Sequence, residues 1–232
     1  MTGSSCVSRR WVALLLSCAL VGCAGVESTL ELAASGDLKT RTKKLRRIEQ
    51  IVRKLIPPRA KHAETRARLE QFFLQRFDRN QDTNYEKDTT LRSQIVALAV
   101  QGEFDCAAKL VAGAIRDDDE ARLVRLVAIQ SLRDLPLGPH RELLAECVQR
   151  EDDTQTRIEL VKTMRCARES ADAPQTWAPP LIAVFLDRHE DASVRFQAHR
   201  AAVELTGAEY AITDENSWRT WLQQHPEAIQ QP

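Results

Sequence analysis

Residues 181–207 read LIAVFLDRHEDASVRFQAHRAAVELTG, and this stretch decides the fold. An apolar run from Leu181 to Leu186 is followed by the acidic turn Glu190-Asp191. After the turn, apolar or small residues lie on one stripe of an α-helix, at Val194, Ala198, Ala201, Ala202 and Leu205. The stretch therefore predicts two helices joined by an acidic turn.

The second of these helices has three earlier counterparts that align with it without gaps. The four segments are LRSQIVALAVQG from Leu91, VRLVAIQSLRDL from Val124, TRIELVKTMRCA from Thr156 and VRFQAHRAAVEL from Val194. Each has an arginine at its second place, and these arginines, Arg92, Arg125, Arg157 and Arg195, are 33, 32 and 38 residues apart. Apolar stretches at 106–115, 143–148 and 181–186 supply partner helices. The period predicts helix pairs, each stacked on its neighbours.

Aspartates precede three of the arginines by four residues, at Asp88, Asp153 and Asp191. An aspartate at this place can cap the first N–H groups of a helix and suits the positive end of the helix dipole. In the second repeat the acidic run lies further back, with Asp119 six residues before Arg125, so the spacing does not decide whether the same contact forms there.

The order of apolar helix, Asp-rich turn and Val-Arg-x-x-Ala-x-x-Ala-Leu resembles the HEAT repeat over residues 91–207. The resemblance implies an all-α fold, a right-handed α-solenoid of about four to five HEAT-like helix pairs. It also implies that the turn aspartates and helix arginines hydrogen-bond along the stack as a structural ladder. The arginines are then structural residues and not ligands of an anionic substrate.

The first 23 residues have the pattern of an export signal. Arg9 and Arg10 precede an apolar run from Trp11 to Val21, which is too short to span a bilayer as a helix. The run ends in Leu20-Val21-Gly22-Cys23, which resembles the lipobox of bacterial lipoproteins. The resemblance implies that residues 1–22 are cleaved, that Cys23 is lipidated and that residues 23–37 are a tether. The mature chain is then anchored to a bacterial membrane in the cell envelope, on the periplasmic side. The alternatives are an ordinary signal peptide and an uncleaved N-terminal helix.

A basic helical segment is expected over residues 38–78. From Leu38 to Arg68 there are twelve basic residues and two acidic ones, while Leu45, Ile48 and Val52 have helical spacing before Pro57-Pro58. Two interpretations stay open. Basic residues 39–68 could help a lipidated Cys23 hold an anionic membrane, or the helix could pack on the first repeat with its charges in water.

A polar loop is expected over residues 79–90. Residues 78–84 read DRNQDTN, which invites comparison with an EF-hand calcium loop, but Thr83 and Thr89 replace the required glycine and glutamate. We therefore expect a solvated loop and no calcium site.

A C-terminal cap helix and tail are expected over residues 208–232. Leu205-Thr-Gly-x-x-Tyr210 followed by Trp218-Arg-Thr-Trp221 resembles the end of bacterial HEAT-repeat lipoproteins, notably those of planctomycetes. Trp218 and Trp221 share one helical face and are expected to close the end of the stack, because a terminal repeat has no further neighbour. An aromatic platform for carbohydrate is the alternative.

No catalytic constellation emerges from the 232 residues. The five histidines show no metal-ligand spacing, and His189-Glu190 is a single pair where a di-iron site needs several. GxSxG and P-loop motifs are absent, so no cofactor is expected. Cys106, Cys147 and Cys166 lie in apolar helical patterns, which predicts buried free thiols, with one disulfide as the alternative.

The charge is unevenly distributed although 33 basic residues balance 33 acidic ones. Residues 69–232 carry 19 basic and 28 acidic residues, which excludes nucleic acid as a partner. The sequence favours a non-catalytic, lipid-anchored HEAT-like scaffold that holds an unknown protein or peptide partner in the cell envelope. The alternative is a helical-repeat enzyme or cofactor-handling protein with a concealed site.

Overall fold

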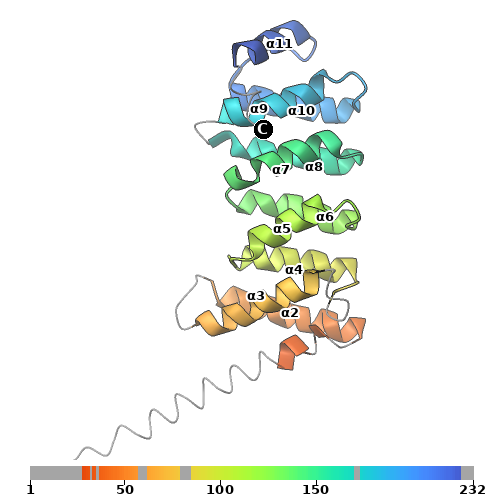
Figure 1. Ribbon diagram of the computed structural model, residues 1–232, viewed down its shortest axis with the longest axis vertical. Coiled ribbons are helices and arrows are strands. Elements are labelled where there is room, and N and C mark those ends of the chain that lie inside the picture. The colour runs from red at the N-terminus through yellow and green to blue at the C-terminus, as the bar shows by residue number, and fades with distance from the viewer. Residues whose placement is uncertain are drawn as a thin grey trace, which may run out of the picture. The chain divides into compact units, whose positions relative to one another are not determined.

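The computed structural model describes residues 28–31, 33–34, 37–56, 62–78, 85–169 and 173–225 (Figure 1). Within these ranges the regular structure is helical and contains no strand, which confirms the all-α prediction. The expected signal segment 1–22, Cys23, Pro57-Pro58 and most of the EF-hand-like stretch lie outside the described residues. The chain divides into two compact units, residues up to Cys106 and residues from Ala107.

The N-terminal unit is built from α2 (Leu38–Lys54), α3 (Ala63–Phe77) and α4 (Thr89–Gln101). Both α2 and α3 pack against α4. The core consists of side chains that helical spacing brings to one face of each helix, namely Leu45, Ile48 and Val52 on α2, Leu69, Phe72 and Phe73 on α3, and Leu91, Ile95, Val96 and Ala99 on α4. The α4 helix, which the repeat alignment places first, thus belongs to the same unit as the basic segment.

The C-terminal end of α4 is stabilised by a side chain of the neighbouring helix α3. The guanidinium of Arg66, on α3, donates to the carbonyl oxygens of Gly102 at 2.8 Å and Glu103 at 2.5 Å. The same group lies 4.4 Å from the centre of the Phe104 ring. Because the last carbonyls of a helix lack partners within it, this arginine satisfies the C-terminus of α4 from a neighbouring helix.

The C-terminal unit is a succession of seven α-helices among the described residues. They are α5 (Ala107–Arg116), α6 (Arg122–Ser131), α7 (Arg141–Arg150), α8 (Thr154–Arg165), α9 (Ala173–Leu186), α10 (Ala192–Thr206) and α11 (Glu215–Gln224). Short 3₁₀ turns at Leu132–Asp134, Gly138–His140 and Cys166–Glu169 join some of them.

These helices pack in two layers, and within each layer a helix contacts the next one along the chain. Each helix of the pairs α5–α6, α7–α8 and α9–α10 packs on its partner. The first helices α5, α7 and α9 contact one another in sequence, and so do the second helices α6, α8 and α10. This packing is consistent with a helical repeat, in which each unit buries its apolar face against the next.

The core positions of the second helices are the repeated positions of the alignment. The first place is filled by Val124, Thr156 and Val194, the fifth by Ala128, Leu160 and Ala198, and the ninth by Leu132, Met164 and Ala202. All nine residues are at most 1% exposed. The periodic stripe expected from the sequence is therefore the buried face of α6, α8 and α10.

Candidate functional site

Three of the four repeat arginines, Arg92, Arg157 and Arg195, bind backbone carbonyl groups that precede their own helices. Arg157 Nε donates to Val148 O at 2.7 Å, at the end of α7, and Arg195 Nε donates to Phe185 O at 2.9 Å, at the end of α9. In the N-terminal unit Arg92 donates to Glu86 O at 2.9 Å. Each guanidinium therefore satisfies polar backbone that a helix end or turn leaves without a helical partner.

In the C-terminal unit Arg125, Arg157 and Arg195 each pair with a glutamate of the following repeat. Arg125 binds Glu151, which precedes α8. Arg157 lies 2.8 Å from Glu190, which precedes α10, and Arg195 lies 4.0 Å from Glu215 at the start of α11. We call these three contacts, Arg125–Glu151, Arg157–Glu190 and Arg195–Glu215, the arginine rungs.

The turn aspartates cap helices and do not take part in the arginine rungs. Asp88, Asp153 and Asp191 accept hydrogen bonds from Leu91 N at 2.9 Å, Thr156 N at 2.8 Å and Ser193 N at 2.8 Å, respectively. Asp153 also pairs with Arg122 at 3.1 Å and not with Arg157. The expected Asp–Arg side-chain ladder is thus replaced by Glu–Arg pairs, because the aspartate carboxylates are occupied by the first turn of their own helices.

Hydrogen bonds at these caps change the acidity of the aspartates. Partial burial alone would raise the pKa of Asp153, but the hydroxyl and backbone N–H of Thr156 and the charge of Arg122 bring it below its ordinary value. The hydroxyl and N–H of Ser193 likewise lower the pKa of Asp191. Both carboxylates are therefore charged at neutral pH, as N-caps require.

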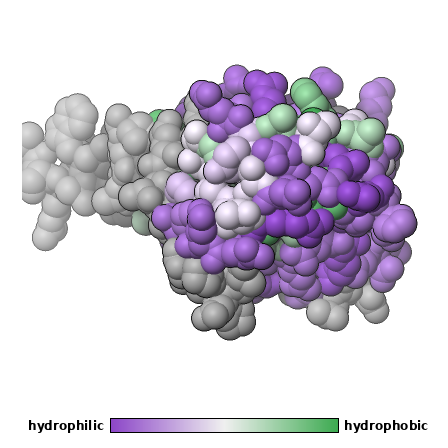
Figure 2. Space-filling view, turned by 90° about the horizontal axis from the view of Figure 1, so that it is seen from above, coloured by the Kyte–Doolittle hydropathy of each residue, from purple (hydrophilic) through white to green (hydrophobic). Residues whose placement is uncertain are grey.

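The two predicted cap tryptophans are buried beneath α11. The Trp218 ring packs edge to face on Phe185 of α9 and His199 of α10, with ring centres 5.3 and 5.6 Å apart. Trp221 is 7% exposed and stacks on His225. In Figure 2, the view from above Figure 1 and so from the side of α11, the surface is mostly hydrophilic. The rings are thus part of the core, and no aromatic platform is open to a carbohydrate.

The three described cysteines are free thiols. Cys106 and Cys147 are buried, as expected, whereas Cys166 is exposed because it lies past the end of α8 in a 3₁₀ turn. Burial, followed by the nearby Glu70 carboxylate, raises the pKa of Cys106 to about 11, and burial also raises the pKa of Cys147. A neutral, buried thiol is a poor nucleophile, which makes both residues core residues and not reactive ones.

Groups of metal-ligating side chains are not found among the described residues. His140 is buried, and burial together with the charge of Arg116 lowers its pKa. The part of the chain that the structure describes also holds no helix that is long and apolar enough to cross a membrane.

The second helices α6, α8 and α10 have side chains at equivalent positions that point away from the core. Because two residues rotate an α-helix by 200°, the residue two places after each buried first position points outward. These residues form an apolar row, in which Leu126 and Ile158 are half-buried and Phe196 is 56% exposed. One and two turns further on lie mostly cationic residues. We call the whole set the second-helix face, and its members are Leu126, Gln130, Arg133, Ile158, Lys162, Arg165, Phe196, Arg200 and Val203.

The polar part of the second-helix face is organised around two carboxylates. Glu159 accepts from Arg133 at 2.6 Å and Lys162 at 2.8 Å. Burial alone would raise the pKa of Glu159, but these two cations bring it below its ordinary value. Glu204 lies 3.5 Å from Arg165 and 3.1 Å from Arg200. Four cations therefore share two carboxylates, which leaves the face with excess positive charge beside its apolar row.

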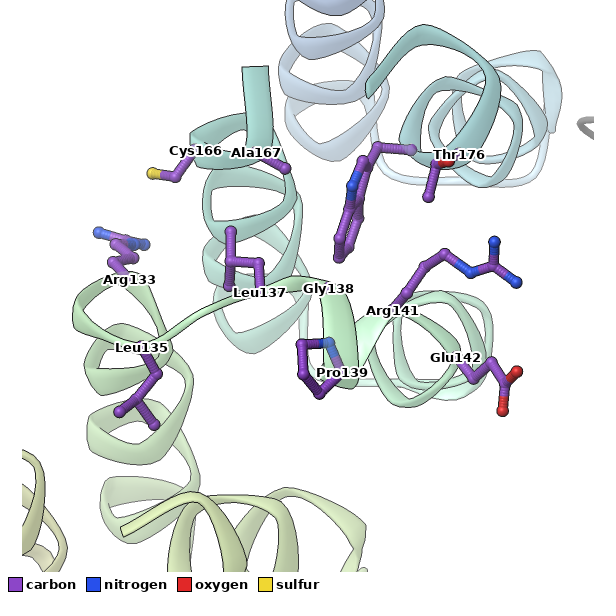
Figure 3. A pocket seen from close by; sticks show the side chains of 11 residues that line it. Arg133, Leu135, Leu137, Gly138, Pro139, Arg141, Glu142, Cys166, Ala167 and Thr176 are labelled. Carbon is purple, nitrogen blue, oxygen red and sulfur yellow. The ribbon is translucent and has the colours of Figure 1, made fainter. Parts of the chain in front are cut away.

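A cavity of about 650 Å³ opens near one end of this face. Its wall includes the turn from Leu135 to Pro139, with Arg133 and Cys166 on one side and Arg141 and Glu142 on the other (Figure 3). Arg133 is already engaged by Glu159, and the Cys166 thiol donates to Lys162 O at 3.4 Å. The cavity thus offers cationic and apolar surface.

No protein-family model and no curated protein matches this chain. The functional residues that sequence reasoning missed are the glutamates of the arginine rungs and the apolar row Leu126, Ile158 and Phe196. A signal for two of these glutamates is present, since Glu151 and Glu190 stand two residues and one residue before a capping aspartate, whereas Glu215 directly follows the capping Asp214. The apolar row follows from the alignment, where it occupies the third place of the last three segments.

Proposed function

We propose that this protein is a non-catalytic scaffold that holds a protein partner against the second-helix face. The observation that carries the proposal is the apolar row Leu126, Ile158 and Phe196, which continues across three contacting helices and is bordered by excess positive charge. An exposed apolar surface with a polar rim marks an interaction site more often than a catalytic one. The matching partner is a segment with apolar side chains next to acidic ones.

The proposal includes a right-handed solenoid of four to five HEAT-like pairs, as in the repeat family that the sequence resembles. The two-layer packing of α5 to α10 supports a solenoid. In such an arrangement each of the repeats that contain α6, α8 and α10 adds one residue of the apolar row and one or two cations to the same face. An extended partner segment would then contact successive repeats in register.

The site of action that we propose is the bacterial cell envelope, with the chain anchored through lipid on Cys23. The supporting feature is the lipobox-like Leu20-Val21-Gly22-Cys23 after a short apolar run. Replacing Cys23 by Ser should move the protein from the membrane fraction to the soluble envelope fraction. Full retention of the Cys23→Ser protein in the membrane would contradict lipid anchoring and leave the scaffold proposal to its own test.

Site-specific photo-crosslinking in native cells tests the scaffold proposal. A photoreactive residue at Phe196 or Ile158 should yield a discrete adduct with a partner protein, whereas one at Glu146, an exposed residue of the first-helix layer, should not. A second substitution, Phe196→Asp, should abolish the Ile158 adduct because it places a charge within the apolar row. Thermal unfolding of Phe196→Asp serves as the folding control, since the ring is mostly exposed.

Equal adducts from the second-helix face and from Glu146 would contradict the proposal. So would an Ile158 adduct that survives Phe196→Asp, because the partner would then not lie along the apolar row. Either result is decisive once thermal unfolding has shown that the Phe196→Asp protein is folded.

The second candidate is a protein that handles a small anionic molecule, and the cavity beside Arg133 and Arg141 favours it. A volume of about 650 Å³ lies within the range of small-molecule sites. Titration calorimetry with inorganic phosphate and with citrate, on the native chain and on Arg141→Gln, tests this candidate. Saturable binding that Arg141→Gln removes would support it, and no measurable heat would exclude it for these anions.

A further inference from the structure

The basic residues of α2 are divided by the fold into two sets with different surroundings. Eight basic residues and one acidic residue lie on this helix. Six of the basic residues are exposed, and helical spacing places them on one stripe centred opposite the buried residues. We call them the α2 stripe, and its members are Lys39, Lys43, Arg46, Arg47, Arg53 and Lys54.

The apolar face of α2 is occupied by the core of its own unit. Leu45, Ile48 and Val52 are at most 3% exposed, and the helix packs against α4. An interfacial membrane helix needs its apolar face free to enter the lipid. Here that face is taken, so α2 can meet a membrane only through the charges of the stripe.

Four cations outside the stripe are already bound by other groups of the N-terminal unit. Arg41 and Arg76 both bind the buried carboxylate of Glu86. Arg66 holds the end of α4, and Arg68 pairs with Glu64 at 2.8 Å. The basic region seen in the sequence is therefore only partly available to a partner.

Within the stripe, by contrast, the described structure supplies a single ion pair. Arg53 lies 2.6 Å from Glu49, an exposed pair one turn apart that contributes little. Lys39, Lys43, Arg46, Arg47 and Lys54 form no ion pair with a residue that the structure describes. Like charges this close repel one another, so an external anionic surface would stabilise them.

We propose that the α2 stripe binds an anionic phospholipid surface electrostatically, with the helix lying flat on the headgroups. A helix of 17 residues presents a straight row about 25 Å long, which suits a plane of headgroups. The stripe contains no aromatic side chain on which the bases of a single-stranded nucleic acid could stack. This inference extends the proposed envelope location but does not depend on the second-helix face.

Vesicle co-sedimentation tests the inference on the chain from residue 23 onward with Cys23→Ser, so that lipid cannot contribute. The vesicles are phosphatidylcholine alone or phosphatidylcholine with about one third phosphatidylglycerol, at about 0.1 M and about 1 M salt. We expect binding only to the phosphatidylglycerol vesicles at the lower salt. The triple substitution Lys43→Gln, Arg46→Gln and Arg47→Gln should lower the affinity roughly 100-fold, at about fivefold per charge.

The matched control removes three exposed cations from other places, Lys87→Gln, Lys109→Gln and Arg116→Gln. It should bind within about twofold of the parent if the stripe carries the interaction. Equal losses in both triple variants, or salt-resistant binding, would overturn the inference. Tighter binding to duplex DNA than to the anionic vesicles would also overturn it and make the stripe a phosphate-binding surface of another kind. Because the Cys23→Ser chain cannot be lipidated, these results are separate from the anchoring test.

Discussion

Arg157 Nη1, on α8, lies 2.8 Å from Glu190 Oε2, which stands in the turn before α10. The same guanidinium donates through Nε to Val148 O at the end of α7. The Arg157 side chain is 18% exposed and that of Glu190 is 7% exposed, so water screens the pair weakly. One side chain of α8 thus connects the end of α7 to the turn between α9 and α10.

Arg157→Ala should destabilise the C-terminal unit by about 1 to 3 kcal/mol, the cost of losing hydrogen bonds to a charged group. Removing the arginine leaves the Glu190 carboxylate and the Val148 carbonyl without this donor. Thermal unfolding followed by circular dichroism measures the effect. Arg188→Ala is the matched control, because Arg188 is 76% exposed and its pair with Glu215 should contribute little. An unchanged melting temperature for Arg157→Ala would contradict a structural role for the rung.

Gly102→Ala should destabilise the N-terminal unit by about 1 to 3 kcal/mol through overpacking. A Cβ at this position would overlap the Phe104 ring and come within 2.9 Å of Val52 Cγ1. Gly113→Ala is the opposite case, since no atom lies within 4 Å of its added Cβ and the residue is inside α5. That substitution should stabilise by about 0.5 to 1 kcal/mol. Urea titrations of both variants would show opposite shifts of the midpoint, and shifts of the same sign would contradict the packing around Gly102.

Acid should destabilise the C-terminal unit below pH 4.5, the ordinary pKa of a glutamate. The folded pKa of Glu159 is lowered, so its contribution to stability is present above that value and is lost as pH falls through the folded pKa. Melting temperatures from neutral pH to about pH 3 measure this dependence. Glu159→Gln should flatten the acid side of the profile, because the amide does not titrate. A profile identical to that of the native protein would show that Glu159 does not contribute.

The buried thiols should make the fold sensitive to alkali. The folded pKa of Cys106 is raised from 9.0 to about 11, so the folded state keeps its thiol proton where the unfolded chain loses it. Stability from this group is therefore complete below pH 9 and falls as pH rises toward 11. Cys106→Ala should reduce the loss.

The exposure of the three described cysteines predicts their reactivity. In the chain from residue 23 onward with Cys23→Ser, whose remaining thiols are Cys106, Cys147 and Cys166, a thiol reagent at neutral pH should modify one cysteine rapidly. Cys166→Ser should abolish that fast phase. Rapid modification of all three thiols would contradict the burial of Cys106 and Cys147.

The repeat helices could be predicted from the sequence because their signal is periodic. Val194, Ala198 and Ala202 lie on one stripe, and the same stripe recurs at a nearly constant step. The full extent of α9 could not be predicted because of Pro179 and Pro180. The helix begins at Ala173 and includes both prolines. Prolines usually interrupt a helix, but burial of Trp177 and Ala178 in the core outweighs that preference here.

The candidate surfaces were harder to predict, because a sequence shows the face of a helix but not what covers it. The apolar spacing of Leu45, Ile48 and Val52 fits a lipid surface and a protein core equally well, and only the packing on α4 distinguishes them. The rung glutamates were missed for a related reason. Glu151 and Glu190 stand at different distances from their capping aspartates, so a fixed spacing does not identify them.

The arginine rungs have a consequence for how the number of repeats in such a chain could change. Each of the rungs Arg125–Glu151 and Arg157–Glu190 connects the second helix of one pair to the turn between the two helices of the next pair. Removal of one complete helix pair, α7 with α8, would leave Arg125 facing the turn of Glu190, a chemically equivalent carboxylate. Duplication of a pair would add a further equivalent junction. Because the junctions are equivalent, whole repeats could be gained or lost in evolution without the need for a new kind of contact.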